Sequence, residues 1–324
     1  MPPVNLKGGL PLSQNMEANS RQGVRKKKKR SLLYSQNAAP YFFIFPFILS
    51  FLIFFAYPVI TTVIMSFQEV LPGQTTFIGL ENYKELWNPT FLTAIRNSTV
   101  YTILTLIILI PVPLVLAVFL NSKLMFAKNF FRSVTFIPAL TSVVVAGMIF
   151  RLIFGGQEGA LLNSILSNFG MEPKAWLNHG GTSMFVLVVL ATWKWMGINI
   201  LYFLAGLQNI PQELYESAEV DGASTSRKFW HITLPLLKPI SIYVFTISIY
   251  GGFSMFAESY MLYGSNRSPN NIGLTIVGYL YQKGIEQNNL GFGSAVGIAL
   301  LVITLIITLI QLKFFGMFKK EEQG

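Results

Sequence analysis

Cysteine is absent from this chain of 324 residues, which excludes disulfide bonds, thiolate metal sites and a cysteine nucleophile. The two histidines, His179 and His231, lie too far apart in sequence to suggest a metal site. Charged residues are also scarce: they form 12% of the chain, about half of the roughly 25% usual in soluble domains. This composition excludes a disordered protein and disfavours an ordinary soluble enzyme.

The chain is rich instead in long apolar runs, and 52% of its residues are hydrophobic. A hydrocarbon core about 30 Å thick is crossed by a helix of roughly 20 apolar residues, in which every backbone polar group is paired. The alternation typical of barrel strands is missing. We therefore expect an all-α polytopic membrane protein, with a membrane domain over residues 40–318. Its six predicted spans cover about residues 40–67, 94–120, 133–155, 182–207, 239–263 and 290–315.

Lysine and arginine are distributed unevenly around these runs. If the N-terminus is cytoplasmic, 17 of the 24 basic residues lie on the cytoplasmic side, which predicts that both termini are cytoplasmic. The basic run Arg25–Arg30 could be a nucleic-acid patch. Because a membrane helix follows ten residues later, the run is better explained as a topology anchor against anionic lipid. We expect membrane lipid but no nucleic acid as a partner, a mostly disordered segment 1–39 and a cytoplasmic tail 319–324.

A few polar residues interrupt the apolar runs. Lys194 and Asn199 lie in the fourth run and Glu258 in the fifth, and ionisable groups at membrane depth are functional candidates. Lys194 could alternatively reach the interface with its long stem. Rings and hydroxyls around Glu258 suit a sugar, although packing or an interfacial belt is the alternative explanation. The residues concerned are Phe253, Phe256, Ser259 and Tyr260.

The loop at residues 208–238, between the fourth and fifth runs, is unlike the other connections. Pro211 suits the first position of a helix, and acidic residues follow at a spacing of three. Gly222 permits the left-handed conformation that ends a helix. A second short helix is predicted from about Thr225 to Ile232, with Pro235 breaking it. The pattern predicts two short helices outside the bilayer that a partner could hold.

This loop also carries a motif. Glu216-Ser217-Ala218 is followed by Gly222 and then by Ile232-Thr-Leu234-Pro235. The spacing resembles that of the membrane subunits of binding-protein-dependent ABC importers, with Ser217 replacing an alanine. Asp221 and Phe229 resemble the carbohydrate branch of that family. Similarity to maltose-type permeases extends over residues 40–315.

The resemblance implies a permease subunit in a bacterial inner membrane. Residues 212–234 of its loop would be the coupling helices that dock on a separate ATPase, and the residues implied in this contact are Glu216, Ser217, Ala218, Asp221, Gly222, Phe229, Leu234 and Pro235. The implied partners are a second, homologous permease, two copies of the ATPase, which would use ATP and Mg, and an extracytoplasmic solute-binding protein. No cofactor or metal is expected in this chain. The residues implied along the sugar pathway are Met196, Gly197, Asn199, Ile200, Phe253, Phe256, Glu258 and Ser259, to which Lys194 and Tyr260 are added from the residues themselves.

The transported molecule is expected to be an oligosaccharide, and overall likeness favours one derived from alginate. For an acidic sugar, Lys194 would be the counter-charge and Glu258 would have to point elsewhere or pair. The alternative function is an ion-coupled secondary transporter, which usually needs a carboxylate relay and broken helices in two repeats. A membrane enzyme is disfavoured because no catalytic group of residues can be assembled. No Gly-Lys dipeptide occurs, so a phosphate-binding P-loop is missing from the sequence.

Overall fold

The computed structural model describes residues 39–122, 125–265 and 267–316, and it divides into two compact units, residues 1–57 and 58–324. In the first unit, helix α1 (Ala39–Phe51) leads into a π-helical turn, η2 (Leu52–Ala56). Its large apolar side chains are exposed, as expected of a segment surrounded by lipid. The predicted tail 319–324 and all but the last residue of the predicted segment 1–39 lie outside the described residues.

The second unit opens with a feature that the all-helical prediction missed. Helix α2 (Tyr57–Met65) is followed by an antiparallel hairpin of β1 (Gln68–Leu71) and β2 (Gln74–Phe77). The hairpin turns at Pro72-Gly73, where Gly73 has a φ of +80° that favours glycine. Its strands are too short for the alternation of a barrel strand to show in the sequence. The hairpin is a small local addition, and the mostly helical chain is consistent with the expected all-α membrane protein.

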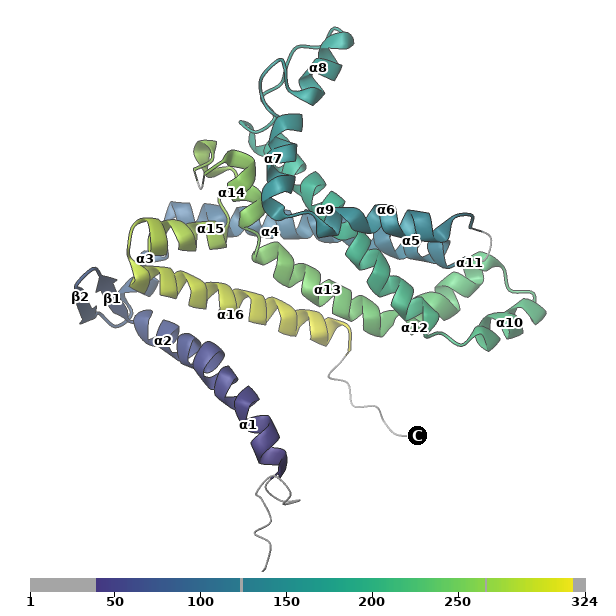
Figure 1. Ribbon diagram of the computed structural model, residues 1–324, viewed down its shortest axis with the longest axis horizontal. Helices are drawn as coiled ribbons and strands as arrows, with labels where there is room; N and C mark the ends of the chain where they lie inside the picture. Colours follow the sequence, from purple (N-terminus) through teal and green to yellow (C-terminus); the bar gives the residue numbers. More distant parts are fainter. Residues whose placement is uncertain (1–38, 123–124, 266, 317–324) are drawn as a thin grey trace, which may run out of the picture. The chain divides into compact units, whose positions relative to one another are not determined.

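Helix α9 (Gly180–Gln208) is the central element of this unit, and α4, α5, α6, α7, α13 and α14 all contact it (Figure 1). Val186, Leu187 and Leu190 of α9 are almost fully buried and pack in one cluster with Phe150 and Phe154. The remaining elements are α3 (Glu81–Glu85), α4 (Pro89–Leu109), α5 (Pro111–Asn121), α6 (Lys128–Leu140), α7 (Val143–Ile153), α8 (Leu161–Asn168), α10 (Gln212–Val220), α11 (Thr225–Lys228), η3 (Phe229–Thr233), α12 (Leu234–Leu236), α13 (Lys238–Phe253), α14 (Ala257–Tyr263), η4 (Pro269–Asn271), α15 (Ile276–Leu280), η5 (Tyr281–Glu286) and α16 (Leu290–Phe314).

Four helices of the described residues are long and apolar enough to cross a membrane: Pro40–Met65, Pro89–Asn121, Gly180–Gln208 and Leu290–Phe314. They coincide with four of the six predicted spans. Two further pairs of helices pass the same test only if each bent pair is taken as one span. The two remaining predicted spans are therefore not single straight helices.

The third predicted span, 133–155, is bent by 96° between α6 and α7. Thr141 and Ser142 lie between the two helices, and the Ser142 hydroxyl accepts a hydrogen bond from the Val144 amide. The Thr141 carbonyl oxygen is 2.6 Å from Nζ of Lys194, which donates to it. Because the local Ser142 hydroxyl and the distant Lys194 ammonium pair the backbone at the bend, the helix can break inside an apolar run.

The fifth predicted span, 239–263, ends early. Helix α13 stops at Phe253, and α14 starts only at Ala257. The carbonyl oxygen of Met255, in the break, accepts a hydrogen bond from Oγ1 of Thr275 at 2.7 Å. At its other end α13 meets the helical segment Thr225–Leu236 at 65°.

Candidate functional site

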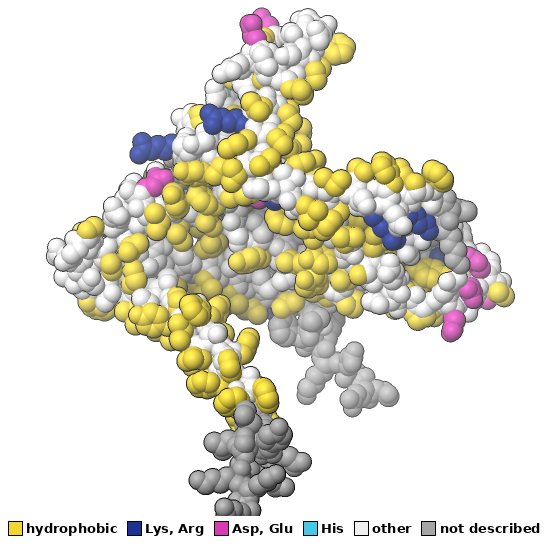
Figure 2. All heavy atoms as spheres, in the orientation of Figure 1, with side chains coloured by type: hydrophobic (Ala, Val, Ile, Leu, Met, Phe, Trp, Pro, Cys, Tyr) yellow, Lys and Arg dark blue, Asp and Glu magenta, His cyan; other side chains and the backbone are white. Residues whose placement is uncertain are grey.

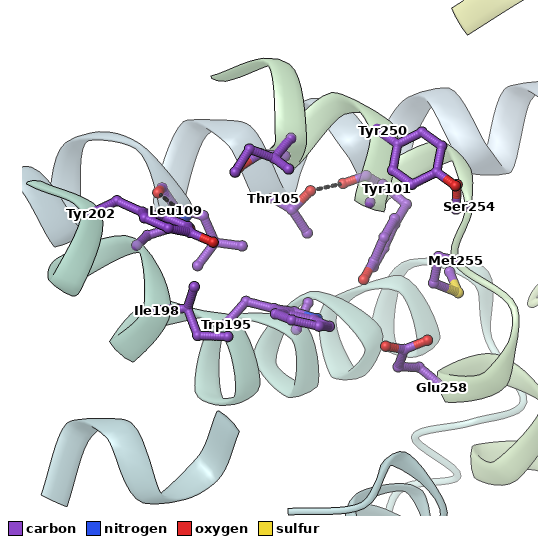
Figure 3. A pocket seen from close by; sticks show the side chains of 16 residues that line it. Tyr101, Thr105, Leu109, Trp195, Ile198, Tyr202, Tyr250, Ser254, Met255 and Glu258 are labelled. Carbon is purple, nitrogen blue, oxygen red and sulfur yellow. Dashed lines mark hydrogen bonds between the residues drawn. The ribbon is translucent and has the colours of Figure 1, made fainter. Parts of the chain in front are cut away.

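A cavity of about 380 Å³ lies between α4, α9, α13 and the break that follows α13 (Figure 3). Residues spaced three or four apart line up on one face of a helix, and this places Tyr101, Thr105 and Leu109 together on α4. The same spacing places Trp195, Asn199 and Tyr202 together on α9. The full lining is Tyr101, Thr105, Leu109, Ala191, Trp195, Ile198, Asn199, Tyr202, Ile247, Ser248, Tyr250, Gly251, Gly252, Ser254, Met255 and Glu258.

Aromatic rings and a single carboxylate dominate the cavity. In Figure 3 the Tyr101 hydroxyl and the Glu258 carboxylate point into the same space beside the Trp195 ring. Within the described part of the chain, neither group has a hydrogen-bond partner, whereas the Thr105 hydroxyl donates to the Tyr101 carbonyl oxygen at 2.9 Å. Glu258 is also the only charged residue of the lining. The cavity therefore offers rings, a free hydroxyl and one acceptor carboxylate to a ligand.

Asn199 has a structural bond as well as a place in the cavity wall. Its Nδ2 donates to the Leu109 carbonyl oxygen at 2.8 Å. In a regular helix this carbonyl would accept from residue 113, but Pro113 has no N–H. The Asn199 side chain thus pairs a backbone group that the proline leaves free inside the membrane domain.

Of the ten residues predicted along the pathway, Asn199 and Glu258 line this cavity, and the other eight do not. The Lys194 ammonium donates to Thr141 and lies 5.4 Å from the centre of the Trp195 ring. At Gly197 a Cβ would collide with the backbone of Thr135, so this glycine allows α6 to approach α9 closely.

The remaining six lie in packed positions outside the cavity. Met196 and Ile200 belong to the apolar cluster of α5 and α9, and Phe253 belongs to that of α4, α15 and α16. Oγ of Ser259 donates to the Gly273 carbonyl oxygen at 2.6 Å. Phe256 and Tyr260 pack together against Tyr281, with ring centres 5.0–6.0 Å apart.

Sequence reasoning missed most of the aromatic and hydroxyl lining. Tyr101 and Thr105 stand four residues apart, as do Trp195 and Asn199, and this helical spacing of polar and aromatic residues was the available signal. After α13 the helical spacing no longer predicts the lining. The helix breaks after Phe253, and Ser254 and Glu258 then line the cavity whereas Ser259 does not. Tyr202, Ser248 and Tyr250 were also missed.

The second candidate site is the loop 208–238, which holds α10 and α11, the turn η3, and α12. Gly222 has a φ of +74° after α10, as predicted. The Ala223 amide donates back to the Ala218 carbonyl oxygen at 2.8 Å, which closes the end of the helix. Figure 2 shows acidic side chains gathered at α10, while hydrophobic side chains cover much of the helical body.

Three side-chain hydrogen bonds connect parts of this loop. Oε1 of Glu216 accepts from Nε2 of Gln212 at 2.9 Å. The hydroxyls of Tyr215 and Thr233 are 2.9 Å apart, and Nζ of Lys228 lies 2.6 Å from Oε1 of Glu219. The first bond lies within α10, whereas the other two join α10 to η3 and α11 and so fix the angle between the helices.

The predicted docking residues divide into two groups. Glu216, Ser217, Asp221 and Gly222 are exposed, and Ala218 is partly buried. Phe229 and Leu234 instead pack against the apolar cluster of α5 and α9.

The prediction that Pro235 breaks the second short helix was wrong. The helical segment runs to Leu236, because η3 is π-helical: the amide of Leu234 donates to Phe229, five residues back. Pro235 stands in the first turn of α12, where its missing N–H is not required.

Comparison with known proteins identifies the family. Residues 100–315 match the model described as "Binding-protein-dependent transport system inner membrane component". The arabinooligosaccharides transport system permease protein AraP of Bacillus subtilis is 61% identical over 292 residues, which cover 90% of this chain and 93% of AraP. AraP of Halalkalibacterium halodurans is 53% identical over 289 residues, covering 89% and 91%.

A solved structure has the same fold. It is a crystal structure of a bacterial ABC transporter that imports the acidic polysaccharide alginate, with a TM-score of 0.77 at 24% identity, covering 87% of this chain and 96% of that one. The family that the loop motif predicted is thereby confirmed: this chain belongs to the inner-membrane components of binding-protein-dependent transport systems.

Proposed function

We propose that this chain is one permease subunit of an ATP-driven importer of a neutral oligosaccharide. The sugar would cross the membrane along the cavity of Tyr101, Trp195 and Glu258. Force would enter through the loop 208–238, seated on a separate ATPase that uses ATP and Mg. A second permease would complete the pathway, a solute-binding protein would deliver the sugar, and both termini would be cytoplasmic.

The exposed surface of α10 is the observation that carries this proposal. Glu213, Glu216 and Glu219 cannot lie in lipid, so this helix belongs outside the bilayer. Yet Val220 is 88% exposed and Leu214 43% exposed on the same helix. Exposed apolar residues beside ordered charges are typical of a surface that a protein partner covers.

The chemistry of the cavity favours a neutral sugar. Aromatic rings pack on the apolar faces of a sugar, while Asn199 and the free hydroxyl of Tyr101 can bond its hydroxyl groups. Lys194, the expected counter-charge for an acidic sugar, is already bound to Thr141. Glu258 would meet an anionic sugar with its own negative charge, and like charges brought together cost several kcal/mol.

Alginate is therefore the less favoured substrate. The similarity to the AraP proteins instead supports arabinooligosaccharides, which carry no charge. The alginate transporter supports only the fold, because it is 24% identical.

Co-purification and reconstitution test the proposal. The tagged chain should bring an ATPase with it, and proteoliposomes should take up arabinooligosaccharide only with ATP and a solute-binding protein. Glu216→Lys should uncouple ATP hydrolysis from transport while the complex remains assembled. Glu158→Lys, the same charge reversal in the exposed loop between α7 and α8, is the matched control and should leave transport unchanged.

Three results would contradict the proposal: no associated ATPase, full transport by Glu216→Lys, or full transport by Gly222→Pro, which alters the corner after α10. Uptake driven by an ion gradient without ATP would instead establish the ion-coupled secondary transporter.

A further inference from the structure

A separate groove of about 620 Å³ lies between α4, the first turns of α9 and the segment 270–272. On α9 the groove lies at the end opposite the loop 208–238, because that loop follows the C-terminus of the helix. None of the residues that line the groove lines the cavity described above. The groove is therefore a distinct candidate site.

The groove is polar at one end and apolar at the other. Thr93, Arg96 and Asn97 line it on the first turns of α4, and Val100, Leu104 and Ile108 follow on the later turns. At 1.5 Å per residue, Arg96 and Ile108 are about 18 Å apart along the helix. On α9, apolar residues likewise follow two glycines, so both walls change in the same direction.

The polar end carries one positive charge and no negative charge. Arg96 is the only ionisable residue of the lining, and its side chain is exposed. Neither of the two salt bridges among the described residues involves it. The mouth is also ordered, because Nδ2 of Asn97 donates to the Asn271 and Leu274 carbonyl oxygens at 2.8 and 3.0 Å. An anion at Arg96 would thus meet no carboxylate in this lining.

The depth of Arg96 matches that of a lipid headgroup. From Val100 to Leu120 the helix Pro89–Asn121 is apolar or weakly polar, a length of about 30 Å and thus the thickness of the hydrocarbon core. Arg96 lies one turn beyond this stretch. Val100 and Leu104 are each 38% exposed and Phe185 is 54% exposed, so the apolar part of the groove is open at the surface.

We propose that this groove binds one anionic phospholipid, with its phosphate at Arg96 and an acyl chain between α4 and α9. A positive charge at headgroup depth, above an apolar channel, matches the two chemistries of such a lipid. A soluble anion would use the arginine alone and leave the apolar part empty. The site does not depend on the substrate or on the ATPase, so it can fail without affecting the proposed function.

Native mass spectrometry of the full transporter, released from nanodiscs of equal phosphatidylglycerol and phosphatidylcholine, tests the site. The wild-type complex should retain phosphatidylglycerol. Arg96→Gln should lower the retained amount about fivefold, the factor that corresponds to about 1 kcal/mol per basic residue at an anionic surface. Leu104→Trp should lower it similarly without changing the charge, because the ring fills the apolar channel.

Arg267→Gln is the matched control, since it removes one exposed arginine that does not line the groove. It should retain the lipid. Unchanged retention in Arg96→Gln, or an equal loss in Arg267→Gln, would overturn the proposal. Efficient cross-linking of a Leu104→Cys chain to the second permease, with no retained lipid, would assign the groove to that subunit and also overturn it.

Discussion

The loop 208–238 and the cavity between α4, α9 and α13 are assembled in different ways. In the loop, hydrogen bonds connect residues close in sequence, such as Gln212 with Glu216, and most of the predicted docking residues are exposed. The cavity depends on long-range bonds such as that of Asn199 to Leu109, 90 residues away. A contiguous surface can be altered residue by residue without disturbing the fold, whereas changes around the cavity alter the packing of several helices at once.

The largest expected effect is a difference in stability between substitutions at two glycines, one in the cavity helix α9 and one in the loop. Gly197→Leu should destabilise the protein by more than about 3 kcal/mol, because the side chain would force α6 away from α9. Gly222→Ala should cost only about 1 kcal/mol, since its Cβ would meet nothing within 4 Å and only the positive φ opposes it. Thermal unfolding of the detergent-solubilised complex measures both. Similar losses in the two variants would contradict the comparison.

A smaller effect is expected at the bend between α6 and α7. Lys194→Met should lower stability by about 1–3 kcal/mol, because it leaves the Thr141 carbonyl oxygen without its donor. If Lys194 supports the bend and does not bind the sugar, the transport KM should change little in the folded fraction. A large rise in KM at unchanged stability would indicate that Lys194 contacts the transported sugar.

Glu258 should affect selectivity more than stability. Glu258→Gln removes the only charge of the cavity lining and keeps the size of the side chain. We expect transport of a singly charged acidic oligosaccharide, relative to its neutral analogue, to rise about tenfold, which corresponds to about 1.4 kcal/mol. The measurement is competitive uptake into proteoliposomes with a solute-binding protein that accepts both sugars. An unchanged ratio would show that the carboxylate does not select by charge.

The smallest effect is expected inside the loop. Tyr215→Phe removes the hydroxyl that meets Thr233, at a cost of about 0.5–1.5 kcal/mol. Because this bond fixes the angle between the helices of the loop, the number of ATP molecules hydrolysed per sugar should rise while the membrane domain unfolds at nearly the same temperature. Coupling equal to that of the wild type would mean that the apolar packing of Phe229 and Leu234 alone sets the angle.

Sequence predicted the straight helices and the corner at Gly222 because their causes are local. An apolar run of sufficient length specifies a spanning helix, and Gly222 closes α10 with its own neighbours. The bend at Thr141 has a distant cause, since the lysine that pairs its carbonyl lies 53 residues later. Hydrophobicity alone could not reveal that bend.

The cavity was harder to predict for a related reason. Ser254 lines it whereas Ser259 and Phe253 do not, and only the position of the break after α13 decides between them. That break depends on Thr275, which bonds Met255 from a separate segment. Aromatic and hydroxyl composition therefore located the region, but could not select the residues within it.

The bonds made by α9 also set an order for biosynthesis. Leu109 and Thr141 are synthesised 90 and 53 residues before their partners Asn199 and Lys194. At a translation rate of about 5–20 residues per second, the Leu109 carbonyl waits roughly 5–20 s for its partner. Until then water or the insertion machinery must pair it, so the second and third hydrophobic segments cannot reach their final conformations before α9 has left the ribosome.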